Sequence, residues 1–168
     1  MYSLNGKTLD NGLHWLGGHV EAQLLLRDYE MPTHRVAEGS PFDAKPEELS
    51  ELADWFTFGQ QAMDDFDDCR IWPHHFDLGW LLQIEGPEKS IGGGMSPGDH
   101  FYDQPYFYIN PYGVDRPAEL PPLNTGARWA NDWFGAILTA EKVVAAENPQ
   151  VAAKSFFADT VSLMKAWY

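Results

Sequence analysis

Cysteine is almost absent from this sequence, since Cys69 is the only one in 168 residues. A single cysteine excludes a disulfide within the chain, which fits a reducing compartment. No stretch approaches the 18 or so consecutive apolar residues of a membrane-spanning helix. The first residues show no basic segment followed by an apolar run, which argues against a secretory signal. We therefore expect a cytoplasmic protein.

Basic residues are also scarce, with 11 Lys and Arg against 25 Asp and Glu, for a net charge of −14. Such a charge repels phosphate backbones and anionic lipid surfaces, so we expect neither nucleic acid nor a membrane as partner. The composition does not decide whether the chain forms a homo-oligomer. Bulky apolar groups are plentiful, including seven Trp, seven Tyr and ten Phe, and we predict one folded domain over residues 1–168.

Helical patterns lie toward the two ends of the chain. Apolar residues recur at helical spacing from Leu9 to Leu24, with Thr8 as the N-cap and an interruption at Gly17-Gly18. A second helix opens at Pro46, and its predicted buried stripe consists of Leu49, Leu52, Phe56, Met63 and Phe66. A third opens at Asn148-Pro149, as N-cap and first helical residue. Its predicted buried face consists of Phe156, Phe157, Val161, Met164 and Trp167.

The middle of the chain shows strand patterns. Apolar and polar residues alternate over 71–84, which predicts one strand. Further strands are predicted over 91–96, 106–110 and 132–138. Helices, then short successive strands, then a helix indicate an α+β fold. We expect an antiparallel sheet of about four strands, packed by N-terminal helices and a C-terminal helix.

A candidate site lies in Trp72-Pro-His-His-Phe-Asp77. On one strand, His75 and Asp77 would share a face, and His74 would lie on the other with Trp72 and Phe76. Three interpretations remain open for the His75–Asp77 pair. It is a buried hydrogen-bonded pair with no ligand, part of a polar pocket for a small molecule, or two ligands of a metal whose third ligand is His34 or His100.

The segment Ser96-Pro97-Gly98-Asp99 predicts a turn, with Gly98 at positive φ and Asp99 accepting backbone hydrogen bonds. The turn would present Ser96 and Asp99 beside the His–Asp pair. Ser96 has the spacing of a Gly-x-Ser-x-Gly nucleophile, but Pro97 has no N–H to stabilise an oxyanion, which argues against a serine hydrolase.

Three further features have structural explanations that we favour. The run Gly92-Gly-Gly94 suits close strand packing better than phosphate binding, because no helix begins there. The four tyrosines at 102, 106, 108 and 112 suit a core better than a pocket wall. Acidic neighbours raise the pKa of the Cys69 thiol, which argues against a nucleophilic role.

Three sequence blocks resemble those of an uncharacterised bacterial protein family without an established function. They are Trp72-Pro-His-His-Phe-Asp77, Ser90-Ile-Gly-Gly-Gly-Met-Ser-Pro-Gly-Asp99 and Gln104-Pro-Tyr-Phe-Tyr-Ile-Asn-Pro111. The resemblance implies that the polar residues of these blocks belong together, but it carries no activity or cofactor. The chain departs from the family pattern at Trp129-Ala130, where members tend to have Trp-His.

The leading hypothesis is a domain that binds a small molecule, and whether it also acts as an enzyme is left open. In it, His75 and Asp77 form the reactive pair, and His74, Ser96, Asp99 and Tyr106 bind the ligand. One alternative is a metal-dependent enzyme that uses His75 and Asp77. The other is a non-catalytic interaction domain, which exposed aromatics on one sheet face would favour. The sequence identifies neither a cofactor nor a metal.

Overall fold

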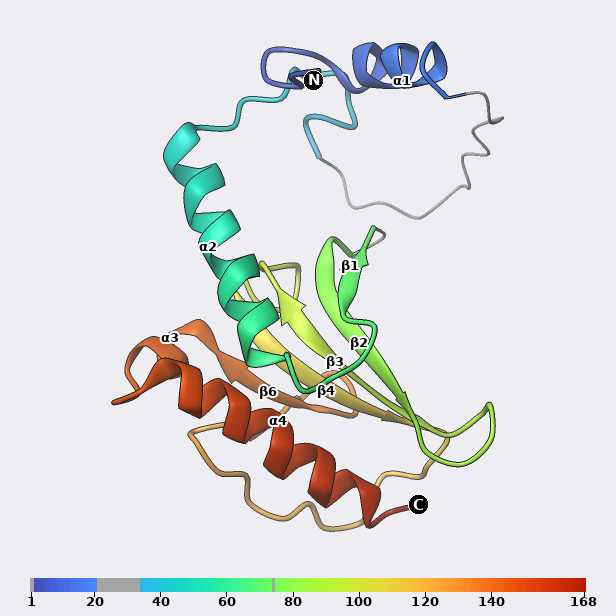
Figure 1. The fold of residues 1–168 in the computed structure, drawn as a ribbon, viewed down its shortest axis with the longest axis vertical. Helices are drawn as coiled ribbons and strands as arrows, with labels where there is room; N and C mark the ends of the chain where they lie inside the picture. The colour runs from blue at the N-terminus through green and yellow to red at the C-terminus, as the bar shows by residue number, and fades with distance from the viewer. Residues whose placement is uncertain (1, 21–33, 74) are drawn as a thin grey trace. The chain divides into compact units, whose positions relative to one another are not determined.

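The computed structural model describes residues 2–20, 34–73 and 75–168. The chain divides into two units, residues 1–50 and residues 51–168. Helix α1 (Leu9–Gly17) belongs to the first unit, and α2 (Pro46–Ala62) begins there and continues into the second (Figure 1). The expectation of a single domain over the whole chain stays a prediction.

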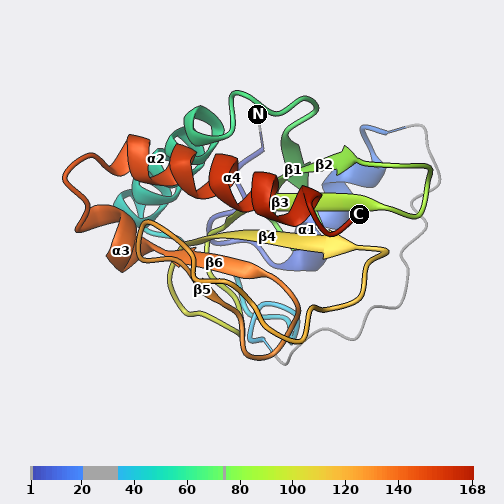
Figure 2. The ribbon, with the colours of Figure 1, turned by 90° about the horizontal axis from the view of Figure 1, so that it is seen from below.

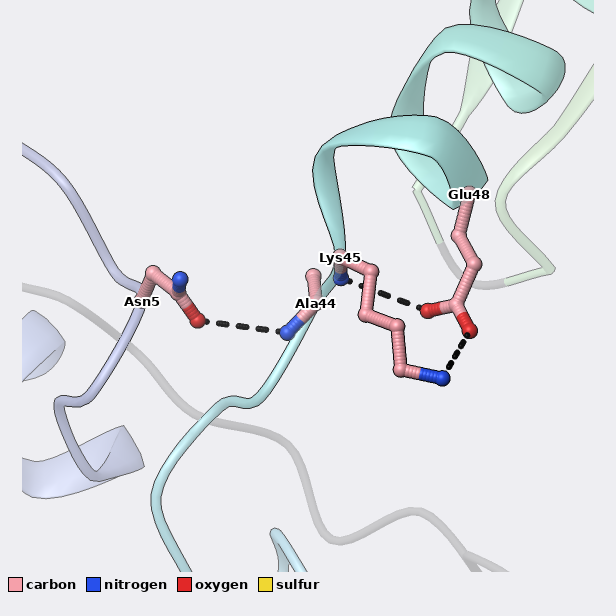
Figure 3. A network of polar contacts seen from close by, with 4 residues as sticks. All are labelled: Asn5, Ala44, Lys45 and Glu48. Atoms are coloured by element: carbon pink, nitrogen blue, oxygen red, sulfur yellow. Dashed lines mark hydrogen bonds and ion pairs between the residues drawn. The ribbon is translucent and has the colours of Figure 1, made fainter.

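In the first unit, hydrogen bonds lie at the start of α1, between the segments around Asn5 and Phe42, and at the start of α2. Thr8 caps α1 as predicted, because its hydroxyl accepts from the Asn11 N–H at 3.3 Å. Asn5 pairs with Phe42 in a parallel bridge, and its side chain accepts from the Ala44 N–H at 3.2 Å (Figure 3). The Glu48 carboxylate accepts from the Lys45 N–H at 3.3 Å and pairs with the Lys45 ammonium at 3.2 Å (Figure 3). These bonds to Lys45, the backbone bond first, lower the pKa of Glu48 and fix the start of α2.

Two of the helix predictions need adjustment. The helical pattern from Val20 to Leu24 falls mostly in 21–33, outside the described residues. Helix α2 begins at Pro46 as expected and ends at Ala62, so Met63 and Phe66 lie just beyond it. Met63 is fully buried, but Leu49 is 52% exposed, and its place in the predicted buried stripe was wrong.

The second unit is built on an antiparallel sheet, and the α+β fold is as predicted. The described residues contain six strands in the spatial order β1-β2-β3-β4-β6-β5, two more than about four. Their bounds are β1 (Arg70–Trp72), β2 (Asp77–Gln83), β3 (Ser90–Ser96), β4 (Tyr106–Tyr112), β5 (Arg128–Trp129) and β6 (Ala136–Thr139). The extra strands are the short edge strands, β1 and β5.

Helices cover one face of this sheet, which we call the core face. Helix α3 (Ala140–Val144) follows β6 directly, and α4 (Pro149–Lys165) runs along the sheet (Figure 2). Asn148 caps α4 as predicted, accepting from the Val151 N–H at 3.2 Å. Phe157 of α4 packs edge-on against Phe107 of β4, with ring centroids 5.5 Å apart. Phe156 and Met164 of α4 are also fully buried, so α4 supplies much of the core.

The acidic run after α2 is partly neutralised within the second unit. Asp64 pairs with Lys154 of α4 at 2.6 Å, and Asp68 pairs with Arg70 at 2.9 Å. The run is therefore tied to α4 and to β1, instead of being only a solvated helix end. In the described part of the chain, no helix has both the length and the apolar character that crossing a membrane requires.

Candidate functional site

A pocket of about 430 Å³ lies in the second unit, lined by side chains from β1 to β4 and neighbouring loops. Five of the six site residues named from the sequence line it, namely His75, Asp77, Ser96, Asp99 and Tyr106. The sixth, His74, lies outside the described residues. The structure thus brings these residues together, and their roles in binding or catalysis stay predictions.

The pocket lies on the face of the sheet opposite the core face. Residues two apart on a strand share a face, and the strand register places Tyr106 opposite Ser96, Tyr108 opposite Gly94, and Asn110 opposite Gly92. Gly94 and Gly92 in turn lie opposite Gly79 and Leu81 of β2. Alternate residues of three adjacent strands therefore form the pocket floor and walls. We call this cavity the tyrosine pocket, after Tyr106, Tyr108 and Tyr112 of β4.

Glycines make room for those tyrosine rings. A Cβ on Gly94 would lie 2.6 Å from the Tyr108 hydroxyl oxygen, and one on Gly92 would lie 3.0 Å from the Tyr112 ring. Gly93 serves the opposite face, where a Cβ would lie 2.4 Å from the buried Trp80 indole. The three glycines therefore allow aromatic rings to lie against both faces of β3. Close packing explains Gly92–Gly94, as the sequence indicated.

The predicted strand over 71–84 is a hairpin, and that expectation was wrong. Strand β1 ends at Trp72, β2 begins at Asp77, and the Phe76 N–H closes the connection on the Trp72 carbonyl at 2.8 Å. Phe76 has φ of +54°, which is rare for a bulky residue, and its ring packs on Phe56 of α2 at 5.5 Å. His75 therefore reaches the pocket from a connection and Asp77 from a strand end.

Asp77 is the most unusual residue of the tyrosine pocket. The residue is only 7% exposed, and its Oδ2 accepts a hydrogen bond from the Tyr108 hydroxyl. Its Oδ1 is buried and has no hydrogen-bond partner among the described residues. One interpretation of the sequence made Asp77 the hydrogen-bond partner of His75, but the hydrogen bond described at this carboxylate comes from Tyr108. A buried carboxylate oxygen that accepts no hydrogen bond is costly in a folded protein.

Asp99 has a different environment, because its carboxylate is already satisfied by the protein. Its Oδ1 accepts from the N–H groups of Phe101 and Tyr102 at 2.8 and 3.2 Å, and its Oδ2 accepts from the Tyr106 hydroxyl at 2.7 Å. The turn has the predicted geometry, with Gly98 at φ +120° and Ser96 accepting from the Gly98 N–H at 3.2 Å. Asp99 therefore holds the turn and the Tyr106 phenol in place.

The tyrosines of β4 act as neutral groups in this pocket. Burial is the largest cause that raises the pKa of Tyr106, Tyr108 and Tyr112 above the ordinary value of 10.0, and the Asp77 carboxylate raises all three further. A phenol with a raised pKa stays protonated near neutral pH, so it donates or accepts hydrogen bonds but does not serve as a base.

Sequence reasoning assigned some of the lining incorrectly. It favoured a core position for the tyrosines at 108 and 112, and both line the pocket. Their period of two along β4, continued by Asn110, is the signal that places them on one sheet face. It assigned no role to Asn110 or Trp133 and placed Trp72 on the opposite face, yet all three line the pocket.

Within residues 2–20, 34–73 and 75–168, no group of three or more His, Cys, Asp and Glu side chains could hold a metal ion. Of the third ligands considered, His34 belongs to the first unit. His100 is exposed in the second unit, with its ring 4.0 Å from that of Phe101. The described residues therefore offer no ligand set around His75 and Asp77.

Cys69 lies before β1 and does not line the pocket. Burial raises the pKa of its thiol to about 11. We expected a raised pKa from the acidic neighbours, and the structure gives desolvation as the cause instead. The thiol is therefore protonated at neutral pH and a poor nucleophile.

Comparisons of the chain with protein-family models, with curated proteins and with solved structures gave no match. The family resemblance therefore rests on the sequence blocks and not on any of these comparisons. Block 72–77 ends in Asp77, block 90–99 ends in Asp99, and block 104–111 contains Tyr106, so polar residues of all three blocks meet in the tyrosine pocket.

Proposed function

We propose that this protein binds a small organic molecule in the tyrosine pocket. The observation that carries the proposal is Oδ1 of Asp77, a buried acceptor without a partner among the described residues, on a side chain that lines the cavity. A ligand that donates a hydrogen bond to this oxygen would remove the cost of leaving it unsatisfied.

The size and lining of the pocket support the proposal. Its volume of about 430 Å³ falls within the range of roughly 300–1,000 Å³ that is usual for small-molecule sites. The lining combines aromatic rings with a few convergent polar groups, which is the usual composition of such sites. Leu81, Phe101 and Tyr112 line it while remaining 42–49% exposed, so a ligand can reach apolar contacts from solvent.

Catalysis on the bound molecule would be a further step beyond binding. The raised pKa of the three tyrosines excludes them as bases near neutral pH, and the Asp99 carboxylate is engaged by three hydrogen bonds. Among the described lining residues, His75 and Asp77 are therefore the acid or base groups we favour for proton transfer. An enzyme built on this pocket would use His75 as the acid or base and Asp77 to position the ligand.

The test is a thermal-shift screen of a metabolite library that contains cationic, neutral and anionic compounds. We expect hits that raise the Tm of the wild-type protein and of Asp115→Asn, an exposed aspartate outside the pocket. The same hits should lose their effect in Asp77→Asn, which keeps an acceptor for Tyr108 but removes the charge.

A second variant separates binding from folding. Gly92→Ala adds a methyl group against the partly exposed Tyr112 ring, at the pocket floor. It should weaken the hits while leaving the far-UV circular dichroism, which reports the backbone fold, unchanged. A library without hits, or hits that are equally strong in Asp77→Asn and Gly92→Ala, would overturn the proposal.

A further inference from the structure

The tyrosine pocket is lined by two carboxylates and by neither lysine nor arginine among the described residues. The two carboxylates are those of Asp77 and Asp99. Two arginines contact other groups of the second unit. Arg70 pairs with Asp68 at 2.9 Å and lies over the Trp72 ring, and Arg128 lies over the Tyr102 ring. No Lys or Arg among the described lining residues therefore compensates the Asp77 carboxylate.

The two carboxylates differ in what they can still accept. Among the described residues, three groups donate hydrogen bonds to Asp99, whereas Asp77 accepts one, from Tyr108. A buried carboxylate is stabilised best by a donor that also carries positive charge, because charge-assisted hydrogen bonds are about twice as strong as neutral ones. An anionic ligand would meet two negative side chains instead.

The aromatic lining suits the same kind of ligand. Trp72, Phe101 and Trp133 line the pocket together with the three tyrosines. The face of an aromatic ring attracts a cation, most strongly for tryptophan. The net charge of −14 also raises the local concentration of cations around the whole protein.

We propose that the ligand of the tyrosine pocket carries a protonated amine, which donates a hydrogen bond to Oδ1 of Asp77 between aromatic side chains. This inference rests on the proposed function and narrows it to one chemical class, small organic ammonium compounds. Phosphorylated and carboxylated ligands without an amine are excluded by the same charges.

The test uses four probes of similar shape: 2-phenylethylamine, its N,N,N-trimethyl derivative, 2-phenylethanol and 3-phenylpropanoate. Their binding to the full chain is measured at pH 7 by protein-observed NMR titration. We expect the amine to bind at least 10-fold more tightly than the alcohol, and the propanoate not to bind. The trimethyl derivative keeps the charge but has no N–H, so it should bind more weakly than the amine.

The variants assign the effect to Asp77. The preference of the amine over the alcohol should disappear in Asp77→Asn and persist in Asp115→Asn. If the alcohol or the propanoate bound as tightly as the amine or more tightly, the proposal of an amine ligand would be wrong, and the proposed function would still stand. The same holds for a preference for the amine that survives in Asp77→Asn, or for a trimethyl derivative that binds as tightly as the amine.

If none of the four probes binds, the charge of the hits from the library screen tests the proposal of an amine ligand. Library hits that are mainly neutral or anionic would overturn the proposal that the ligand is an amine, but would leave standing the proposal that the pocket binds a small molecule. Cationic hits that need Asp77 would support an amine ligand, and the absence of any hit would overturn both proposals.

Discussion

Tyr108 on β4 donates its phenolic hydrogen bond to Asp77 at the start of β2, across β3, which lies between the two strands. The contact is possible because Gly94 and Gly79 lie beneath the phenol, where a Cβ would come within 2.6 and 3.2 Å of the hydroxyl oxygen. One hydrogen bond thus links the packing of the sheet to the buried carboxylate of the pocket.

Tyr108→Phe should lower the free energy of unfolding by about 1–3 kcal/mol, because it leaves both oxygens of a buried carboxylate without a donor. Urea denaturation at pH 7 measures the change. Tyr112→Phe is the matched control, since the Tyr112 ring is 49% exposed and lies on the same strand. Equal effects of the two substitutions would show that the Tyr108–Asp77 bond contributes nothing.

Gly94→Ala should lower the free energy of unfolding by about 1–3 kcal/mol or more, because the added methyl group overpacks the sheet. Its Cβ would lie 2.4 Å from the Leu78 carbonyl, which is backbone and cannot rotate away. Gly17→Ala in α1 is the control, since nothing lies within 4 Å of that Cβ and alanine favours a helix. Denaturation curves of the two variants should shift in opposite directions.

Local signals in the sequence predicted the elements whose ends they mark. Thr8, Pro46 and Asn148-Pro149 gave the starts of three helices, because capping depends on residues adjacent in the chain. The glycine-rich segment of β3 and the sheet-favouring residues of β4 were also predicted as strands. The antiparallel α+β class followed from the order of these elements.

The features that sequence reasoning missed depend on distant residues or lack local signals. The hairpin between β1 and β2 has no glycine at its positive-φ position, which Phe76 occupies, so the alternating pattern seemed to continue. Tyr108 and Asp77 are 31 residues apart, and their contact requires the registers of two strand pairs. A sequence gives neither register, and so it suggested the nearer His75 as the partner of Asp77.

Cys69 should react with Ellman's reagent at pH 8 about 100-fold more slowly in the folded protein than in denaturant. The burial that raises its pKa from 9.0 to about 11 lowers the thiolate fraction by about that factor. It is the only cysteine in the chain, so the reaction followed by absorbance reports one site. Similar rates in the two states would show that the thiol is not buried as described.

Unfolding free energy should fall as the pH rises above 10 and should be insensitive to the tyrosines of the pocket below about pH 9. Burial raises the pKa of Tyr108 above 10.0, whereas in the unfolded chain it ionises near that value. Above pH 10 the native state therefore holds a proton that the unfolded state has lost, so stability decreases with rising pH. The limit for one phenol is about 1.4 kcal/mol per pH unit.

Urea denaturation of the wild type and of Tyr108→Phe at pH 8, 9, 10 and 11 isolates the contribution of this phenol. The wild type should lose stability more steeply than the variant above pH 10, and their difference should stay constant between pH 8 and 9. Tyr106 and Tyr112 remain in both proteins, so their own raised pKa values add the same slope to each curve. Parallel curves up to pH 11 would mean that Tyr108 ionises alike in the folded and unfolded states. Its hydroxyl would then not be held between β3 and the Asp77 carboxylate.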